Sequence, residues 1–216
     1  MNLKKNHTQD TTGVEMVDWV ATDNLTSIIS LPRKIIQKFN LFHKGIGVIV
    51  VDHRGRIFIH KRSSSKKVFP SMYDMFIGGV CSSGEPGDFT LKRELSEEVG
   101  INTFDVIISM KEMANLKGIS NVKDFCEFSK KKPKTESDLF YIGDTTVLTS
   151  YNHCLVLCYV LLCNEKQVND LRFIDGEIDS GEWMSLEELI HDLTLRRNDY
   201  VPDGLQVWDN FPIDIY

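Results

Sequence analysis

The sequence lacks features that would place it in a membrane, in a disulfide-bonded domain or on a nucleic acid. No run approaches the roughly 18 consecutive apolar residues that a membrane-spanning helix needs. The five cysteines contain no C-x-x-C pair, which favours free thiols over a disulfide framework or a zinc site. The net charge of −6 disfavours general nucleic-acid binding. It does not disfavour a nucleotide, because local cations and a metal ion can neutralise phosphates.

The N-terminus also lacks the apolar core of a signal peptide, so we expect a cytoplasmic protein, with the nucleus as an alternative location. Residues 1–13 are polar and predict a disordered leader. The chain has 216 residues, of which 42% are hydrophobic, and this is enough for one domain with a full core. We predict a single domain over residues 14–216, with an N-terminal extension at 14–42 and a polar surface insertion at 115–137.

The hydrophobic pattern predicts strands interleaved with a few helices, which is typical of an α/β fold whose mixed sheet is covered by helices. Predicted strands lie within 14–30 and at 45–51, 56–60, 74–80, 106–113, 139–148 and 154–163. Predicted helices lie at 32–39, 88–99 and 186–193. In the second helix, Leu91, Leu95 and Val99 form one apolar stripe, with Asp88 expected to cap its start and Gly100 its end. A capping box of Ser185 and Glu188 opens the third.

Three glutamates on the 88–99 helix form the pattern that carries chemistry. Glu94 and Glu98 are one turn apart, and Glu97 is three residues from Glu94. Carboxylates this close repel one another, and a divalent cation such as Mg²⁺ or Mn²⁺ would neutralise them. Gly79 supplies a backbone that a ligand can approach, with a carbonyl able to face the metal. Such a metal can polarise a phosphoryl oxygen and activate water. The competing interpretation is an acidic helix face in solvent.

The stretch from Gly79 to Ile101 resembles the Nudix box, G-x5-E-x7-R-E-U-x-E-E-x-G-U, at every fixed position. The similarity extends over about residues 43–193 and implies the Nudix α/β/α sandwich with a mixed β-sheet. It also implies a metal-dependent pyrophosphohydrolase that uses Mg²⁺, with Mn²⁺ as a substitute. The substrate would be a small-molecule diphosphate, either a nucleoside diphosphate derivative or a related compound. Many members of the family pair as homodimers, so the resemblance suggests a homodimer as well.

The resemblance assigns catalysis and metal binding to residues of the box. Glu97 and Glu98 would be the principal metal ligands, joined by the carbonyl of Gly79. Glu94 would bind a further metal ion or orient the attacking water. Arg93, the remaining catalytic candidate, would hold the helix against its preceding loop.

Further charged residues receive supporting roles. The resemblance pairs Glu85 with Arg93 in keeping the loop and helix in register. A basic loop at 62–67 is similar to one Nudix branch, the isopentenyl-diphosphate isomerases and their hydrolase-like relatives. In that branch Arg62, Lys66 and Lys67 would grip the diphosphate. The alternative for these cations is a solvated basic loop.

Two other functions compete with hydrolysis. An isomerase would use a cysteine near Cys81, but the isomerases depart from the intact box, and the partner residues they need are incomplete here. A non-catalytic binding module would usually have lost a box glutamate, and none is lost. Nudix enzymes often place an extra acid before the last helix, and Glu177 or Glu182 could serve as base or metal ligand. The alternative is an acidic surface loop.

Overall fold

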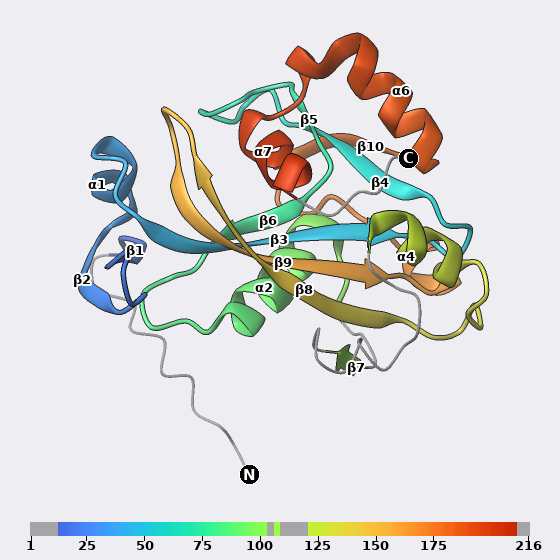
Figure 1. Ribbon diagram of the computed structural model, residues 1–216, viewed down its shortest axis with the longest axis horizontal. Coiled ribbons are helices and arrows are strands. Elements are labelled where there is room, and N and C mark those ends of the chain that lie inside the picture. Colours follow the sequence, from blue (N-terminus) through green and yellow to red (C-terminus); the bar gives the residue numbers. More distant parts are fainter. Residues whose placement is uncertain (1–12, 103–105, 109–120, 211–216) are drawn as a thin grey trace.

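The computed structural model describes residues 13–102, 106–108 and 121–210, and its main feature is an eight-stranded mixed sheet (Figure 1). The sheet order is β10-β4-β3-β9-β8-β7, with β5 added on β4 and β6 added on β3. Pairs β3–β9 and β7–β8 are parallel and the other pairs are antiparallel. The strands are β3 (His43–Val51), β4 (Ile57–Arg62), β5 (Tyr73–Asp74), β6 (Ile77–Val80), β7 (Val106–Ile108), β8 (Asp138–Leu148), β9 (His153–Leu162) and β10 (Ile178–Met184).

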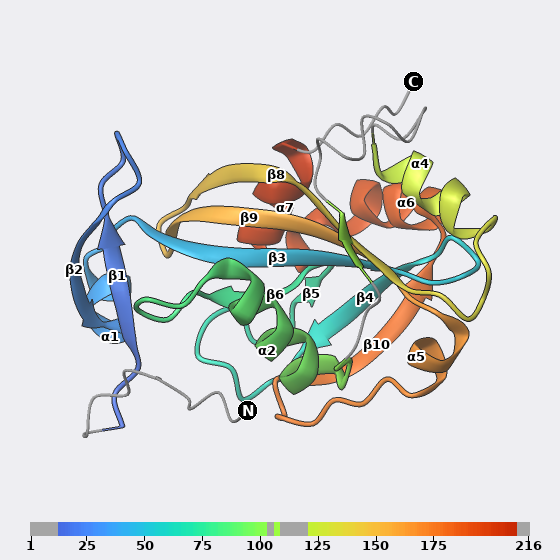
Figure 2. The same ribbon diagram turned by 90° about the horizontal axis from the view of Figure 1, so that it is seen from below.

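Helices cover both faces of this sheet (Figure 2). Helix α2 (Gly87–Val99) packs on one face, and α4 (Val122–Ser129), α6 (Leu186–Arg196) and α7 (Pro202–Asn210) pack on the other. Strand β3 explains the layering, because Ile49 and Val51 belong to the core under α4, α6 and α7 while Val48 and Val50 belong to the core under α2. The predicted α/β/α sandwich is therefore confirmed.

Helix α2 forms largely as its sequence predicts. Leu91, Leu95 and Val99 are fully buried, and burying each such side chain contributes about 1.5–3 kcal/mol. The helix ends at Gly100 in the left-handed conformation, with φ +75°, as expected. The predicted cap by Asp88 is wrong, since Pro86 holds the N-cap position. Asp88 lies inside the first turn, where its charge can still interact favourably with the helix dipole.

The N-terminal extension folds as a hairpin of β1 (Met16–Val20) and β2 (Ser27–Pro32), followed by α1 (Arg33–Lys38). This agrees with the predicted strands and helix. The predicted strands at 45–51 and 56–60 pair as β3 and β4 only at the turn between them, where Val51 faces Ile57, and the two strands then part. Beyond the turn β3 pairs with β6, and β4 pairs with β5 and β10.

Part of the predicted insertion is not a polar loop. Residues 1–12 of the predicted 1–13 leader and residues 115–120 of the predicted insertion lie outside the described residues. Within the rest, α4 buries Val122, Phe125 and Cys126 against the sheet. The interpretation as an exposed excursion is wrong there, because apolar residues at a spacing of three and four form a helix face between charged neighbours.

The C-terminal elements are only partly as predicted. Helix α6 has the predicted capping box, in which Glu188 N donates to Ser185 Oγ (3.2 Å) and Ser185 N donates to Glu188 Oε2 (2.7 Å). Strand β10 and helix α7 were not predicted, nor were α5 (Glu165–Asn169) and the short 3-10 helix η1 (Arg197–Asp199). Within the described ranges, no helix combines the length and apolar character that crossing a bilayer requires.

Candidate functional site

The site begins where β6 meets α2. Gly79 pairs with Ile46 of β3 and faces the helix. A Cβ atom added to Gly79 would lie 2.1 Å from Glu94 Oε1 and 2.5 Å from its Cδ. Only glycine therefore lets the Glu94 carboxylate lie directly against the strand backbone.

Glu94 and Glu98 lie buried side by side on this face of α2. Their exposed fractions are 8% and 6%. Burial raises the pKa of both carboxyls, and the charge of Glu94 raises the pKa of Glu98 further. Within the described part of the chain, the Glu98 carboxylate accepts no hydrogen bond. Buried carboxylate oxygens are the hard donors that a divalent cation prefers, and the uncompensated Glu98 carboxylate has the greater need of one.

Arg93 links the acidic residues of the box. Its guanidinium lies 2.8 Å from Glu94, 3.3 Å from Glu97 and 3.6 Å from Glu85, and it also donates to the carbonyl of Val80 at 3.4 Å. These contacts tie α2 to the end of β6 and to the loop between them. Arg93 is thus placed to position the Glu94 side chain.

Glu85 occupies that loop. Its Oε2 accepts hydrogen bonds from Ser82 N (3.3 Å) and Thr90 Oγ1 (3.0 Å). It therefore bridges the start of the loop and the first turns of α2.

Glu97 is placed differently from the other two helix glutamates. Its side chain is 53% exposed and forms an ion pair with Arg93. Accordingly, no group of three His, Cys, Asp or Glu side chains among the described residues is arranged to hold a metal ion. Glu94 and Glu98 fit a hard cation, as burial and charge show, whereas Glu97 stands beside them on the exposed side of the helix.

The loop before β10 brings Glu177 to this acidic pair. The charge of Glu177 raises the pKa of both Glu94 and Glu98, and Lys66 forms an ion pair with Glu177. Glu182 instead lies exposed on β10 opposite Ile59. The sequence left the choice between Glu177 and Glu182 open, and the fold favours Glu177.

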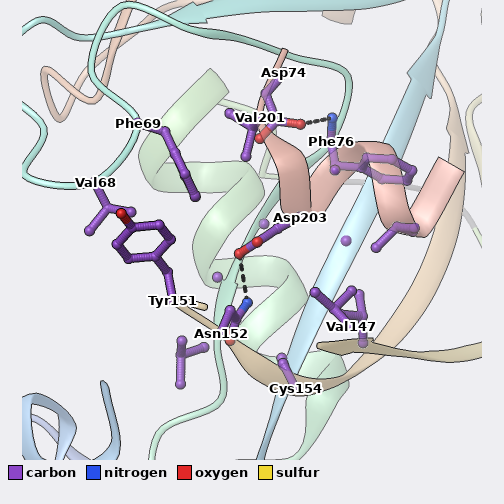
Figure 3. Close-up of a pocket in the computed structure, with 18 of the residues that line it drawn as sticks. Val68, Phe69, Asp74, Phe76, Val147, Tyr151, Asn152, Cys154, Val201 and Asp203 are labelled. Atoms are coloured by element: carbon purple, nitrogen blue, oxygen red, sulfur yellow. Dashed lines mark hydrogen bonds between the residues drawn. The ribbon is translucent and has the colours of Figure 1, made fainter. Parts of the chain in front are cut away.

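A pocket of about 320 Å³ adjoins the site, where β3 and β4 part (Figure 3). Glu98, Gly78 and Gly79 line it, and so does Arg62 of β4. Among the described residues the buried Nε of Arg62 has no hydrogen-bond partner. This leaves a donor for an anionic ligand.

The structure separates the three basic residues that the sequence grouped. Arg62 lines the pocket, and Lys66 reaches the acidic pair through Glu177. Lys67 is exposed and is not among the pocket residues. Sequence reasoning also missed Asp74 and Asp203, which line the pocket from β5 and α7, because isolated aspartates carry no motif.

Cys81 is buried in the apolar core beneath α2. Burial raises the pKa of its thiol, with the charge of Glu85 adding to the shift. The thiolate that nucleophilic or acid–base chemistry needs is therefore disfavoured.

Comparison with known proteins assigns the family. The family model described as NUDIX domain matches residues 41–204, and the chain belongs to the Nudix family. It is 47% identical to the uncharacterized Nudix hydrolase SCO1686 of Streptomyces coelicolor over an alignment of 60 residues. That alignment covers 28% of this chain and 33% of SCO1686. It is 26% identical over 192 residues to the uncharacterized Nudix hydrolase YfcD of Salmonella typhi, and this alignment covers 89% of this chain and 82% of YfcD. Both relatives are named as Nudix hydrolases.

The extent of these matches differs between relatives. The matches span 33%, 47% and 51% of the length of the first three curated relatives. Among solved structures, DR0079 from Deinococcus radiodurans has a TM-score of 0.58 at 17% identity, covering 84% of this chain and 90% of that one. This similarity shows the shared fold.

Proposed function

We propose that this protein hydrolyses a diphosphate linkage in a small molecule, either a nucleoside diphosphate derivative or a related diphosphate. The observation that carries the proposal is the buried, mutually repelling pair Glu94 and Glu98, of which Glu98 lines a pocket that Arg62 also lines. A divalent cation would offset the charge of the two carboxylates, and the cation and Arg62 together would attract an anionic substrate.

In this proposal Glu94, Glu98 and the carbonyl of Gly79 would hold Mg²⁺ or Mn²⁺, with Glu97 nearby on the exposed side of the helix. Such an ion would supply positive charge for the diphosphate and lower the pKa of the attacking water. Arg93 fixes Glu94 through its ion pair, and Glu85 fixes the loop. Arg62 binds a phosphate oxygen through its free donor.

Glu177 is the proposed general base. It lies close enough to raise the pKa values of Glu94 and Glu98, and Lys66 holds its carboxylate. A base must reach the water it deprotonates, and a carboxylate on a loop beside the proposed metal ligands meets that requirement. Lys66 thus acts on the substrate indirectly, and Lys67 contributes charge at the surface.

The isomerase alternative receives less support. It needs a reactive thiol, whereas Cys81 is buried with a raised pKa. The relatives reported above have hydrolase names, and the similarity to the isomerase branch stays a prediction. A homodimer and a cytoplasmic or nuclear location stay predictions as well.

The test is product release with Mg²⁺ from a panel of nucleotides, sugar nucleotides, dinucleoside polyphosphates, thiamine diphosphate and prenyl diphosphates. Wild type is compared with Glu98→Gln and with Glu187→Gln, which removes an exposed charge on α6. Glu98→Gln should lower kcat on the order of 100-fold or more, as loss of one preorganised electrostatic group does. Glu187→Gln should match wild type. If no panel member is cleaved yet one raises Tm, the protein is a binding module instead.

A further inference from the structure

The pocket contains a second pair of carboxylates, distinct from the acidic residues of α2. Asp74 of β5 and Asp203 of α7 both line it, and we call them the acceptor pair (Figure 3). Asp74 is only 8% exposed. Burial raises its pKa to about 6, with Arg62 opposing the shift and Asp203 adding to it. The pocket thus has a cationic residue, Arg62, within electrostatic reach of an anionic pair.

Asp203 is held in place by the turn between β8 and β9. Its Oδ1 accepts from Thr149 Oγ1 and its Oδ2 accepts from Asn152 Nδ2, both at 2.9 Å. Two carboxylate oxygens offer about four acceptor sites, so these bonds orient the group and leave capacity for a ligand. The position in the first turn of α7 adds a favourable interaction with the helix dipole.

Asp74 is brought close by a glycine of the same helix. A Cβ atom at Gly204 would lie 2.6 Å from Asp74 Oδ1. That oxygen accepts a hydrogen bond from Phe76 N at 3.1 Å. Helix α7 can therefore approach β5 closely, and the two aspartates share one cavity.

Aromatic rings border the same pocket. Phe69 and Tyr151 meet edge to face, with ring centroids 5.5 Å apart and planes at 81°. Phe69 has φ +53°, a conformation uncommon for a bulky residue. Its ring packs against the β8–β9 turn that also holds Asp203. A ligand beside the acceptor pair would contact flat apolar surface as well as oxygen acceptors.

We propose that the acceptor pair selects a substrate whose non-phosphate group carries N–H or O–H donors. The inference rests on the proposed hydrolase function for the identity of the diphosphate end. A further phosphate here would be repelled by two carboxylates. A bare hydrocarbon would remove water from them and supply no donor, which is costly for charged groups.

Binding can be measured without turnover by calorimetry with Ca²⁺ in place of Mg²⁺. The probes are pairs in which the second member lacks one donor group of the first: ADP with purine riboside 5′-diphosphate, ADP with 2′-deoxy-ADP, and UDP-glucose with UDP-2-deoxyglucose. Isopentenyl diphosphate is the hydrocarbon probe. In wild type, the donor-bearing member of at least one pair should bind tenfold or more tightly, because it donates a hydrogen bond to a charged acceptor.

Variants assign that preference to the acceptor pair. It should fall below threefold in Asp74→Asn or Asp203→Asn, because an amide replaces an acceptor with a donor. It should persist in Asp23→Asn, which removes an exposed carboxylate in the β1–β2 turn.

Three results would overturn the inference. They are a preference below tenfold in every pair, a preference that survives in both acceptor variants, and isopentenyl diphosphate binding as tightly as the donor-bearing probes. Hydrolysis is a separate measurement. A donor preference without cleavage of any panel substrate would refute the proposed function and leave the selectivity of the pocket standing.

Discussion

Replacing Gly79 with alanine tests the contact on which the proposed metal site depends. The new Cβ would lie 2.1 Å from Glu94 Oε1, whereas real Cβ contacts essentially never fall below 3.0 Å. The carboxylate must therefore shift by about 0.9 Å. Glu94 is buried and held by Arg93 at 2.8 Å, so the shift would disturb that ion pair as well.

We expect Gly79→Ala to lower kcat about 100-fold, because a misplacement of about 1 Å has an effect of that size. The free energy of unfolding should fall by only about 1–3 kcal/mol, the usual cost of overpacking. The assay is steady-state hydrolysis of the substrate identified by the panel, over a range of Mg²⁺ concentrations, together with urea denaturation. The two measurements separate a displaced carboxylate from general loss of structure.

Gly143→Ala is the matched control. Gly143 has φ +119°, so alanine strains the backbone there, but the added Cβ has nothing within 4 Å among the described residues. It should lower stability and leave kcat within threefold of wild type. The reasoning would be refuted if Gly79→Ala kept kcat within threefold of wild type at saturating Mg²⁺.

Three further predictions follow from burial and charge. Leu95→Ala should lower the free energy of unfolding by about 2–5 kcal/mol in urea denaturation, whereas exposed Leu195→Ala should change it little. Glu177→Gln should lower kcat on the order of 100-fold as a lost general base, while Glu182→Gln should not, and equal activities of the two would remove Glu177 from the mechanism. Burial raises the folded-state pKa of Asp74 from 3.8 to about 6. As pH rises from about 4 to 6, the unfolded chain releases this proton before the folded protein does, so the free energy of unfolding falls over that range. The difference amounts to about 3 kcal/mol, and denaturation of Asp74→Asn across that pH range should lack it.

Local sequence was sufficient for elements whose signal lies within a few residues. The stripe of Leu91, Leu95 and Val99 predicted α2. The three-residue spacing of Ser185 and Glu188 predicted the capping box that opens α6. The spacing of the box placed Glu94 and Glu98 one helical turn apart. These features depend on helix periodicity and end chemistry, which neighbouring residues largely determine.

Other elements depended on contacts that local sequence does not encode. Strand β10 has an exposed, charged pattern and is stabilised by pairing with β4. Helix α4 was not predicted because the lysines in and after it made the segment look like a polar loop. The helix is stabilised by burial of Phe125 and Cys126. The family resemblance made Glu97 and Glu98 the principal metal ligands. In the fold Glu97 faces solvent and Arg93, while Glu98 is enclosed by elements distant in the chain.

The sequence by itself determined the family pattern and the helix that carries the acidic residues. Only the tertiary structure decided which residues surround the pocket. The charge of Glu177 reaches Glu98 from the loop before β10, and Asp74 and Asp203 line one pocket because Gly204 lets α7 approach β5. The physical reason is that helix periodicity is local, whereas a pocket forms where distant segments pack together. Substrate selection therefore has no signature in any short stretch of the sequence.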